Sequence, residues 1–276
     1  MAEALRLVDP LPESQKAEAR PSAIIDVNLD HFVELEADQA RLNAELEAKS
    51  PEGVVEWAGA AFGESVILSS SFGAESALML HLVTRILPKV RVVFLDTGYL
   101  FPDTYRFAEQ LRERFNLDLR VYAPAISTAR QEALWGQLWN GGQEELERYQ
   151  SINKVEPMQR ALRELGARAW LAGLRREQTK FRAGLKPLEL QDGVFKVHPI
   201  LNFTREDVRR YMAEHELPYH PLHALGYRSI GDVHSTRATR EGENERDGRN
   251  LGVHSECGIH LPRTPEENAS LKASSL

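Results

Sequence analysis

The chain has 276 residues, of which 42% are hydrophobic and 27% are charged, and its formal net charge is −7. This length and composition are typical of a globular protein with one large α/β domain, and the acidic balance argues against a general nucleic-acid-binding protein. No apolar run is long enough for a membrane span, and residues 1–10 lack the apolar segment of an export signal. With a single cysteine, this predicts a protein of the reducing cytoplasm.

The N-terminal part of the sequence predicts an arm and two helices. Residues 1–23 show no periodicity, which is typical of a loose arm. Residues 29–48 repeat apolar positions at helical spacing and predict a first helix. Ser50 followed by Pro51 has the pattern of an N-cap and a first helical residue, so a second helix is expected from there through Phe62.

Five short apolar runs then predict β-strands, and helical patterns separate most of them. The predicted strands are residues 65–70, 90–95, 117–122, 169–172 and 194–198, and the predicted helices are 77–87, 102–115, 155–165 and 205–215, the last capped by Thr204. This alternation predicts a doubly wound, mostly parallel α/β sheet. Because ligands bind at the carboxyl ends of such strands, the loops after the first, second and fourth strands are expected to meet at one site.

Regular patterning fades after about residue 221. The sequence therefore predicts an α/β nucleotide-binding domain over residues 24–220, including its N-terminal helices, and a mobile C-terminal tail over residues 221–276. The frequent glycines of this tail are consistent with a flexible chain.

Cys257 is the only cysteine, and it lies in the tail within Ser255-Glu-Cys-Gly-Ile-His260. A lone thiol cannot form an internal disulfide or a Cys-rich metal site. If it is reactive it acts as a single nucleophile, and a thiol from another protein must resolve the product. His260, three residues on, could supply the positive charge that lowers a thiol pKa. The alternative is that Cys257 is a small buried hydrophobe.

The loop after the first predicted strand reads Ser69-Ser-Ser-Phe-Gly-Ala-Glu-Ser76. Its hydroxyls, its glycine and the helix that follows offer several donors to a phosphate-like anion. The loop lacks the Gly-Lys-Ser/Thr ending of a Walker A motif, and it lacks the Gly-x-Gly-x-x-Gly fingerprint of dinucleotide-binding folds. The alternative is a turn that binds no ligand.

Six stretches together resemble one family. They are Ser69-Ser-Ser-Phe-Gly-Ala-Glu-Ser76, Leu95-Asp-Thr-Gly-Tyr-Leu-Phe-Pro-Asp-Thr-Tyr-Arg-Phe107, Ile152-Asn-Lys-Val-Glu-Pro-Met158, Gly173-Leu-Arg-Arg-Glu-Gln178, Gly226-Tyr-Arg-Ser-Ile-Gly-Asp-Val-His-Ser-Thr-Arg237 and Glu256-Cys-Gly-Ile-His260. In this order they resemble the adenylyl-sulfate and phosphoadenylyl-sulfate reductases, and specifically their thioredoxin-dependent branch without an iron–sulfur cluster.

The resemblance implies an adenine-nucleotide α-hydrolase-like fold with a modified PP-loop, and a reaction in two steps. The cysteine thiolate attacks the sulfur of the terminal sulfuryl group and expels the nucleoside phosphate, which leaves an enzyme S-sulfocysteine. Thioredoxin or glutaredoxin then attacks this adduct and releases sulfite. The requirement for an external dithiol agrees with the presence of one thiol in the chain.

The resemblance also implies which residues act. Cys257 and His260 would be catalytic. The substrate contacts would be Ser69, Ser70, Ser71, Phe72, Gly73, Glu75, Ser76, Asp96, Thr97, Gly98, Lys154, Gly173, Arg175, Arg176, Arg246 and Arg249. The spacing Arg246-x-x-Arg249 would put two guanidinium groups on one face of a single helical turn, which suits bidentate binding of an oxyanion. The alternative for each arginine is a solvated surface charge.

One departure within the family concerns the cofactor. The cluster-bearing branch has cysteines where this chain has Tyr149, Gln150, Asp232 and Ser235, so no iron–sulfur cluster, metal or other cofactor is expected. In this family, loss of the cluster usually accompanies a preference for the 3′-phosphorylated nucleotide. The stretch Glu245-Arg-Asp-Gly-Arg249 looks more like the cluster-bearing branch, which keeps a cluster-free adenylyl-sulfate reductase as an alternative.

We therefore interpret the sequence as that of a cofactor-free phosphoadenylyl-sulfate reductase of assimilatory sulfate reduction. We expect it to be a homodimer, to use thioredoxin or glutaredoxin, and to bind neither nucleic acid nor a membrane. A PP-loop ATP pyrophosphatase or nucleotidyl transferase is a second alternative, although its Ser-Gly-Gly-x-Asp-Ser type loop is not matched here. A nucleotide-sensing or scaffold protein is a third, and it leaves the thiol beside a histidine without a role.

Overall fold

The structure is a computed structural model that describes residues 29–249, 256 and 258–261. The predicted arm over residues 1–23 and the predicted nucleophile Cys257 lie outside the described residues. The described part of the chain starts with α1 (Leu29–Ala37), α2 (Gln39–Glu47) and α3 (Pro51–Phe62). The cap predicted for α3 is confirmed, because the Ser50 side chain accepts a hydrogen bond from the Gly53 amide at 3.1 Å.

The single helix predicted over residues 29–48 is two helices, which is a correction. The chain leaves helical geometry at Asp38, whose φ and ψ are −92° and 7°, and α2 starts one residue later. An aspartate favours such a position because its side chain competes with the helical backbone for hydrogen bonds. The break lets α2 cover a sheet edge, where Asn43 exchanges hydrogen bonds with the backbone of Leu188.

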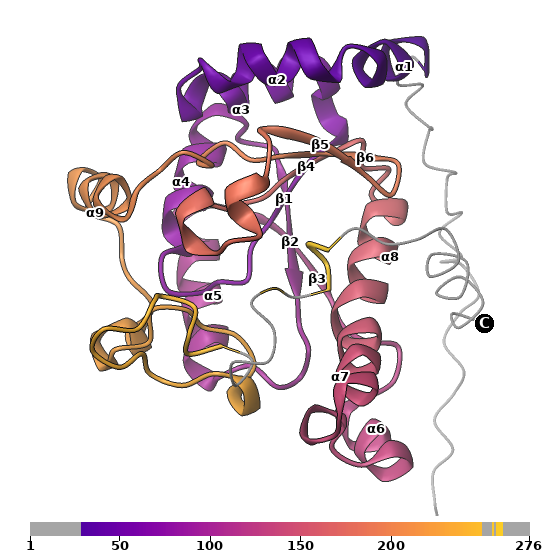
Figure 1. The fold of residues 1–276 in the computed structure, drawn as a ribbon, viewed down its shortest axis with the longest axis vertical. Helices are drawn as coiled ribbons and strands as arrows, with labels where there is room; N and C mark the ends of the chain where they lie inside the picture. Colours follow the sequence, from indigo (N-terminus) through magenta and orange to yellow (C-terminus); the bar gives the residue numbers. More distant parts are fainter. Residues whose placement is uncertain (1–28, 250–255, 257, 262–276) are drawn as a thin grey trace, which may run out of the picture.

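A six-stranded sheet forms the centre of the molecule (Figure 1). Its strands are β1 (Val66–Ser69), β2 (Arg91–Leu95), β3 (Asp118–Tyr122), β4 (Ala169–Leu171), β5 (Leu188–Gln191) and β6 (Val194–Val197). The order is β3-β2-β1-β4-β6-β5, and every neighbouring pair is parallel except the β5–β6 hairpin. The predicted doubly wound, mostly parallel sheet is therefore confirmed.

Strand β5 was not predicted. It joins β6 through Asp192 and Gly193, which both have positive φ, at 55° and 75°. Two such residues form the tight turn that suits the twist of a hairpin. In this short edge strand only Leu188 is buried and the next three residues are half-buried, which leaves little hydrophobic signal in the sequence.

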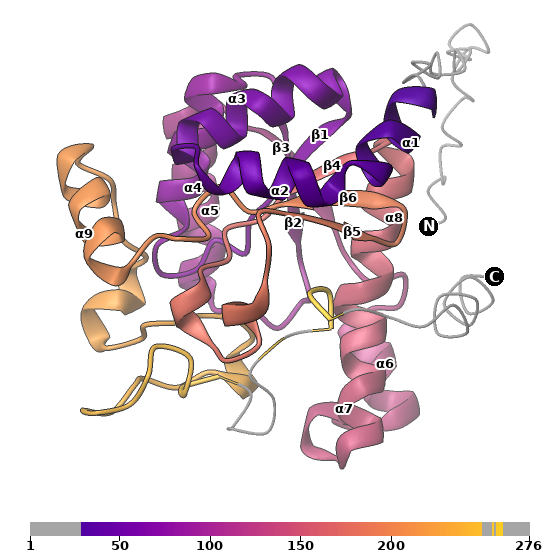
Figure 2. The ribbon, with the colours of Figure 1, turned by 45° about the horizontal axis from the view of Figure 1, so that its top comes forward.

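Helices cover both faces of the sheet. Helices α3, α4 (Ser76–Ile86) and α5 (Pro102–Phe115) lie on one face, and α8 (Glu156–Glu164) lies on the other (Figures 1 and 2). Successive residues of β1 serve the two layers, because Leu68 packs in the core of the α4 side and Ile67 in that of the α8 side. Helix α9 (Arg205–Glu214) packs beside α4.

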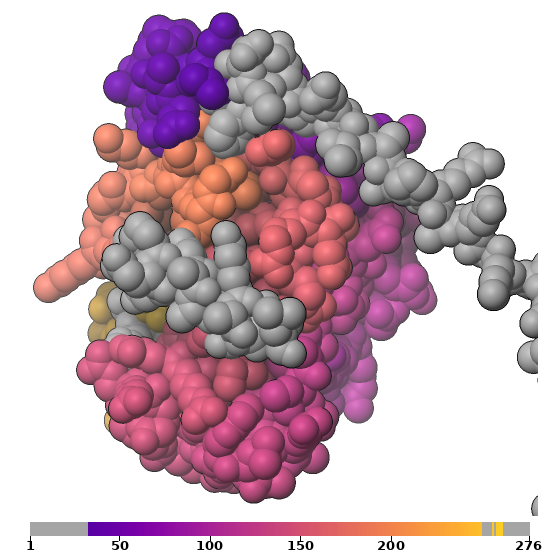
Figure 3. All heavy atoms as spheres, turned by 90° about the vertical axis from the view of Figure 1, so that its right-hand side faces the viewer, coloured from indigo at the N-terminus to yellow at the C-terminus, as the bar shows by residue number. Residues whose placement is uncertain are grey.

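Two helices between β3 and α8 were also missed. They are α6 (Thr128–Trp135) and α7 (Gln143–Gln150), and a π-helical turn, Ser151–Val155, joins α7 to α8. This region makes the end of the molecule opposite the N-terminal helices α1 and α2, as Figure 3 shows from the α8 side. The Arg148 guanidinium covers the Trp135 ring at 4.2 Å, which shields an aromatic side chain of this region.

The first part of the predicted tail lies against the carboxyl ends of the strands. It contains two 3₁₀ turns, Pro221–Leu225 and Val233–Ser235, and isolated bridges pair Leu100 with Asp232 and Thr236 with Arg249. The backbone groups of this segment form hydrogen bonds with other loops and not within a helix or a long strand. The sequence of the segment therefore shows no periodic hydrophobic pattern. None of the described helices is long and apolar enough to cross a membrane.

Candidate active site

A pocket of about 270 Å³ lies at the carboxyl ends of the parallel strands, where the sequence predicted a site. Of the predicted site residues, those that line it are Ser69, Ser70, Ser71, Gly73, Glu75, Ser76, Thr97, Lys154, Gly173, Arg175, Arg246, Arg249 and His260. The loops after β1, β2 and β4 therefore meet as expected. A larger hollow of about 1270 Å³ lies at the opposite ends of the strands and contains none of these residues.

The loop after β1 is held open by its own hydroxyls. The Ser70 hydroxyl accepts a hydrogen bond from the Phe72 amide at 3.1 Å, and the Ser76 hydroxyl donates to the Gly73 carbonyl at 3.0 Å. Phe72 does not line the pocket, since its side chain is fully buried against Phe94. Its φ of 48° is unusual for a bulky residue, and such strain is found at ligand-binding loops.

The loop after β2 lines the pocket with Thr97 and Leu100. The Thr97 hydroxyl faces the pocket, whereas Asp96 and Gly98 shape the loop behind it. The Asp96 carboxylate accepts hydrogen bonds from the Gly98 amide at 2.9 Å and from the Tyr105 hydroxyl at 2.6 Å. Gly98 has a φ of 73°, and a Cβ there would overlap Thr128, so only glycine fits.

Lys154 enters the pocket from the π-helical turn, a feature common at functional sites. Its ammonium lies 2.5 Å from the Asp232 carboxylate, which also accepts a hydrogen bond from the Thr97 hydroxyl at 2.6 Å. Burial raises the pKa of Asp232, but Lys154 and Thr97 outweigh burial and bring it to about 2. The carboxylate therefore stays ionised and fixes the lysine.

The four positions that correspond to cluster cysteines lie in this same region. Tyr149 is buried and hydrogen-bonds His234 at 3.0 Å, and the His234 ring stacks on Trp139 with centroids 4.3 Å apart. Asp232 and Ser235 are buried as well. Within the described residues, no group of three or more histidine, cysteine, aspartate or glutamate side chains is arranged to hold a metal ion.

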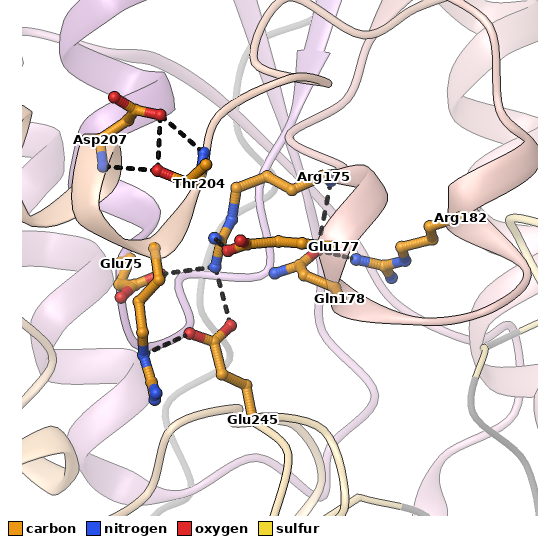
Figure 4. A network of polar contacts seen from close by, with 9 residues as sticks. Glu75, Arg175, Glu177, Gln178, Arg182, Thr204, Asp207 and Glu245 are labelled. Atoms are coloured by element: carbon orange, nitrogen blue, oxygen red, sulfur yellow. Dashed lines mark hydrogen bonds and ion pairs between the residues drawn. The ribbon is translucent and has the colours of Figure 1, made fainter.

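Arg175 is the most enclosed cation of the pocket, with 2% of its surface exposed. Its guanidinium contacts three carboxylates, those of Glu75, Glu177 and Glu245, as Figure 4 shows. Burial and the nearby Glu245 raise the pKa of Glu75, while Arg175 lowers it. An anion that enters this corner meets a cation already aligned by the protein.

Arg176, although adjacent in sequence, lies apart from the pocket. Its guanidinium pairs with Glu47 of α2 at 2.9 Å and also contacts Asn202. This pair lowers the pKa of Glu47 to about 2, chiefly through the hydrogen bond from Arg176. The geometry gives Arg176 the role of joining α2 to the sheet and does not favour its predicted contact with the substrate.

Arg246 and Arg249 both line the pocket, but not on a helical turn as predicted, which is a correction. The Arg249 amide donates to the Arg246 carbonyl at 2.9 Å within a tight turn, and Arg249 then pairs with Thr236 as an isolated bridge. The glycine in this turn, Gly248, packs on the Arg237 carbonyl. A turn still brings both guanidinium groups to one pocket, and Arg249 lies against Gly231.

His260 faces the pocket and stacks on Trp170, with ring centroids 5.6 Å apart. Burial lowers the pKa of His260 well below its ordinary value, and Lys196 and Arg182 lower it further. A neutral ring does not fit the role of a cation that lowers a thiol pKa. The neighbouring cations Lys196 and Arg182 were not singled out in the sequence, because they belong to no motif and reach the site only through the fold.

Most of this chain matches a known protein family and its members. The sequence model of the phosphoadenosine phosphosulfate reductase domain matches residues 65–238. A phosphoadenosine 5′-phosphosulfate reductase of Synechocystis is 49% identical over 241 residues, which is 87% of this chain and 97% of the relative. The enzyme of the same name from Alkalilimnicola ehrlichii is 52% identical over 216 residues, 78% and 88% of the two chains.

The chain belongs to the phosphoadenosine phosphosulfate reductase family. The family predicted from the six sequence stretches is therefore confirmed.

Solved structures agree with this family and with the predicted fold. A phosphoadenylyl-sulfate reductase from Candida auris, solved with phosphate, superposes with a TM-score of 0.63 at 31% identity and covers 75% of this chain and 97% of its own. FMN adenylyltransferase from Candida glabrata shares the fold alone, with a TM-score of 0.52 at 13% identity over 91% of this chain and 90% of its own. The adenine-nucleotide α-hydrolase-like fold is thereby confirmed.

Proposed function

We propose that this protein reduces 3′-phosphoadenylyl sulfate to sulfite and adenosine 3′,5′-bisphosphate, with Cys257 as the nucleophile. The observation that carries the proposal is the position of the residues around Cys257. Ile259 and His260 line the same pocket as the serine loop, Lys154 and Arg175. Because Cys257 is two residues before Ile259 in the chain, its thiol must lie close to the pocket where an anionic nucleotide would bind.

The proposed reaction has two balanced steps. The Cys257 thiolate attacks the sulfuryl sulfur, an S–S bond forms, and the bond from sulfur to the phosphate oxygen breaks. The nucleoside bisphosphate leaves with the electron pair, and the cations of the pocket stabilise its charge. In the second step one thiolate of a dithiol donor attacks the cysteine sulfur of the adduct and expels sulfite, which leaves a mixed disulfide. The second thiol of the donor then attacks this mixed disulfide, so that the Cys257 thiolate is released and the donor is oxidised to a disulfide.

We also propose that the electron donor is thioredoxin or glutaredoxin and that no cluster takes part. The chain has one cysteine, and a four-cysteine cluster cannot be ligated by one thiolate. The cytoplasmic location, predicted from the single cysteine and from residues 1–10, and the expected homodimer remain part of the proposal.

The test is intact-protein mass spectrometry of the wild type with the nucleotide and no reductant. A sulfonate adduct on Cys257 is expected, and reduced thioredoxin should remove it and release sulfite. The variant Cys257→Ser should form no adduct and no sulfite, yet bind adenosine 3′,5′-bisphosphate as the wild type does. The same preparation should contain no stoichiometric iron.

Two results would contradict the proposal. Appreciable turnover by Cys257→Ser would exclude the thiol mechanism. Stoichiometric iron that is required for activity would exclude the cluster-free reaction.

A further inference from the structure

Side chains from several parts of the fold hold the described residues on either side of Cys257. We call this set the seat: Arg182 and Thr179, which bind Glu256, and Gln150 and Gln191, which bind residues 258–261. The Glu256 carboxylate is 3% exposed and forms a two-pronged ion pair with the Arg182 guanidinium, at 2.9 Å from Nε and 2.7 Å from Nη2. The Thr179 hydroxyl donates to the same carboxylate at 2.7 Å. Arg182 is itself buried, so the two charges depend on each other for compensation.

The residues that follow Cys257 are held by other parts of the fold. The Gly258 amide donates to the Gln150 side chain at 2.5 Å, and the Gln191 amide group donates to the carbonyls of Ile259 and Leu261 at 3.2 and 3.3 Å. The seat occupies the space between the sheet and α8, where Figures 1 and 2 show the short yellow segment.

Lys196 organises this second half of the seat. Its buried ammonium donates to the Gln191 side-chain oxygen at 3.1 Å, so the Gln191 nitrogen must face the tail carbonyls. The same ammonium lies 4.4 Å from the centre of the Trp170 ring, on which His260 stacks. The Trp170 ring nitrogen in turn donates to the Ser69 hydroxyl at 2.6 Å, which connects the seat to the serine-rich loop after β1.

We propose that Arg182 is a positioning residue that holds the segment around Cys257 at the nucleotide pocket through its ion pair with Glu256. The two-pronged pair sets both the place and the direction of the chain one residue before the nucleophile. Arg246, a pocket cation, lies 3.9 Å from the same carboxylate, so the seat brings the segment beside a predicted substrate contact. This inference rests on the proposed function for its catalytic consequence.

The consequence differs for the two half-reactions. Attack on the sulfuryl group needs the thiol aligned with a bound nucleotide, and a seated segment supplies that alignment in advance. Removal of the adduct by a protein dithiol takes place after the nucleotide has reacted. Its rate therefore does not depend on alignment of the thiol with the nucleotide. A defect in Arg182 should therefore slow the formation of the adduct and spare its removal.

The first arm of the test does not depend on turnover. Because the chain has one cysteine, the rate of alkylation by iodoacetamide reports on Cys257 alone. Measured at the high-pH plateau, where the thiol is fully ionised, the rate reports access. We expect Glu256→Gln and Arg182→Lys to raise it about tenfold, since a charged hydrogen bond is worth at least one power of ten in an equilibrium constant. Lysine keeps the charge of Arg182 but cannot form the two-pronged pair.

The second arm measures the two half-reactions separately. In single turnovers with saturating nucleotide and no reductant, adduct formation should slow by about tenfold or more in both variants. Removal of a preformed adduct by reduced thioredoxin should stay within about twofold of the wild type, well under the tenfold change of one lost charged bond. The thermal midpoint and the affinity for adenosine 3′,5′-bisphosphate confirm that each variant is folded.

The matched control is Glu243→Gln. Glu243 forms an equally two-pronged pair with Arg237, at 2.7 and 2.9 Å, but away from the seat. It should leave both arms unchanged. The proposal is overturned if alkylation rates are unchanged in Glu256→Gln and Arg182→Lys, or if both half-reactions slow equally. A wild type that forms no adduct would defeat the proposed function instead, and the alkylation arm would still decide on the seat.

Discussion

Three cations of the pocket are each held by a carboxylate of the protein. Lys154 pairs with Asp232, Arg175 with Glu245, and Arg182 with Glu256. Such pairs keep the cations aligned before a ligand arrives, and they reduce the charge that an anionic nucleotide meets. An anion must therefore compete with Glu245 for Arg175, and the outcome depends on the additional donors of the serine loop.

At the scale of single residues we predict that Arg246→Ala and Arg249→Ala each weaken the use of the nucleotide. Each guanidinium lines the pocket, and a charge-assisted hydrogen bond to a desolvated anion is worth about 1.5–3 kcal/mol. The value of kcat/KM should fall by roughly ten- to a hundredfold.

Arg240→Ala is the control for this pair, because Arg240 is an exposed arginine of the same stretch that does not line the pocket. It should change kcat/KM little. If the Arg246 and Arg249 variants behave like Arg240→Ala, their guanidinium groups are surface charges.

At the scale of elements, the N-terminus of α9 connects a helix cap to the charged residues of the pocket. Helix α9 starts at a capping box in which Thr204 accepts from the Asp207 amide at 3.1 Å and the Asp207 carboxylate accepts from the Thr204 amide at 2.8 Å. The first residue of the helix, Arg205, then pairs with Glu245 at 2.9 Å, the carboxylate that also contacts Arg175. Figure 4 shows this cap beside the Arg175 network.

We predict that Thr204→Ala lowers the free energy of unfolding by about 1 kcal/mol, the usual cost of losing an N-cap. Urea unfolding followed by circular dichroism measures it. Arg209→Ala, on the exposed side of the same helix, should change stability by less than about 0.5 kcal/mol. Equal effects of the two substitutions would show that the cap contributes nothing.

At the scale of the whole molecule, buried neutral histidines make the free energy of unfolding depend on pH. Burial lowers the pKa of His198 to about 3 and that of His220 to about 4. Below the ordinary histidine pKa of about 6.5, the unfolded chain binds protons that the folded chain does not. The stability is therefore complete above about pH 6.5 and falls as the pH is lowered toward these folded values.

We predict that the free energy of unfolding falls between pH 7 and pH 5, with a limiting slope of about 1.4 kcal/mol per pH unit for each such histidine. Urea titrations at several pH values measure this slope. His198→Gln removes one titrating group and should make the dependence shallower. A stability that is independent of pH over this range would contradict the buried, neutral state of these histidines.

The choice of nucleotide also belongs to the whole pocket. A 3′-phosphate needs at least one further cationic contact, worth about 1.5–3 kcal/mol. We predict that kcat/KM is at least roughly tenfold higher for the 3′-phosphorylated substrate. Competition between the products adenosine 3′,5′-bisphosphate and adenosine 5′-monophosphate measures the same preference. If the second inhibits as well as the first, the chain is a cluster-free adenylyl-sulfate reductase.

Local patterns in the sequence were enough to predict the serine-rich loop that lines the pocket, the parallel strands and the caps of α3 and α9. The loop Ser69-Ser-Ser-Phe-Gly-Ala-Glu-Ser76 lies at a strand end and a helix start, and a cap such as Ser50 depends on the hydrogen bonds of three or four neighbouring residues. Such features are encoded within a few residues, because they depend on backbone angles and side-chain periodicity.

The tertiary structure alone decided which side chains meet at the site. Arg175 has an extended backbone and lines the pocket, whereas Arg176 begins a 3₁₀ turn and pairs with Glu47 of α2. Arg182 has no motif, yet it meets Glu256, which lies 74 residues further along the chain. Contacts of this range are set by the packing of the sheet, its loops and the tail, which no local pattern contains.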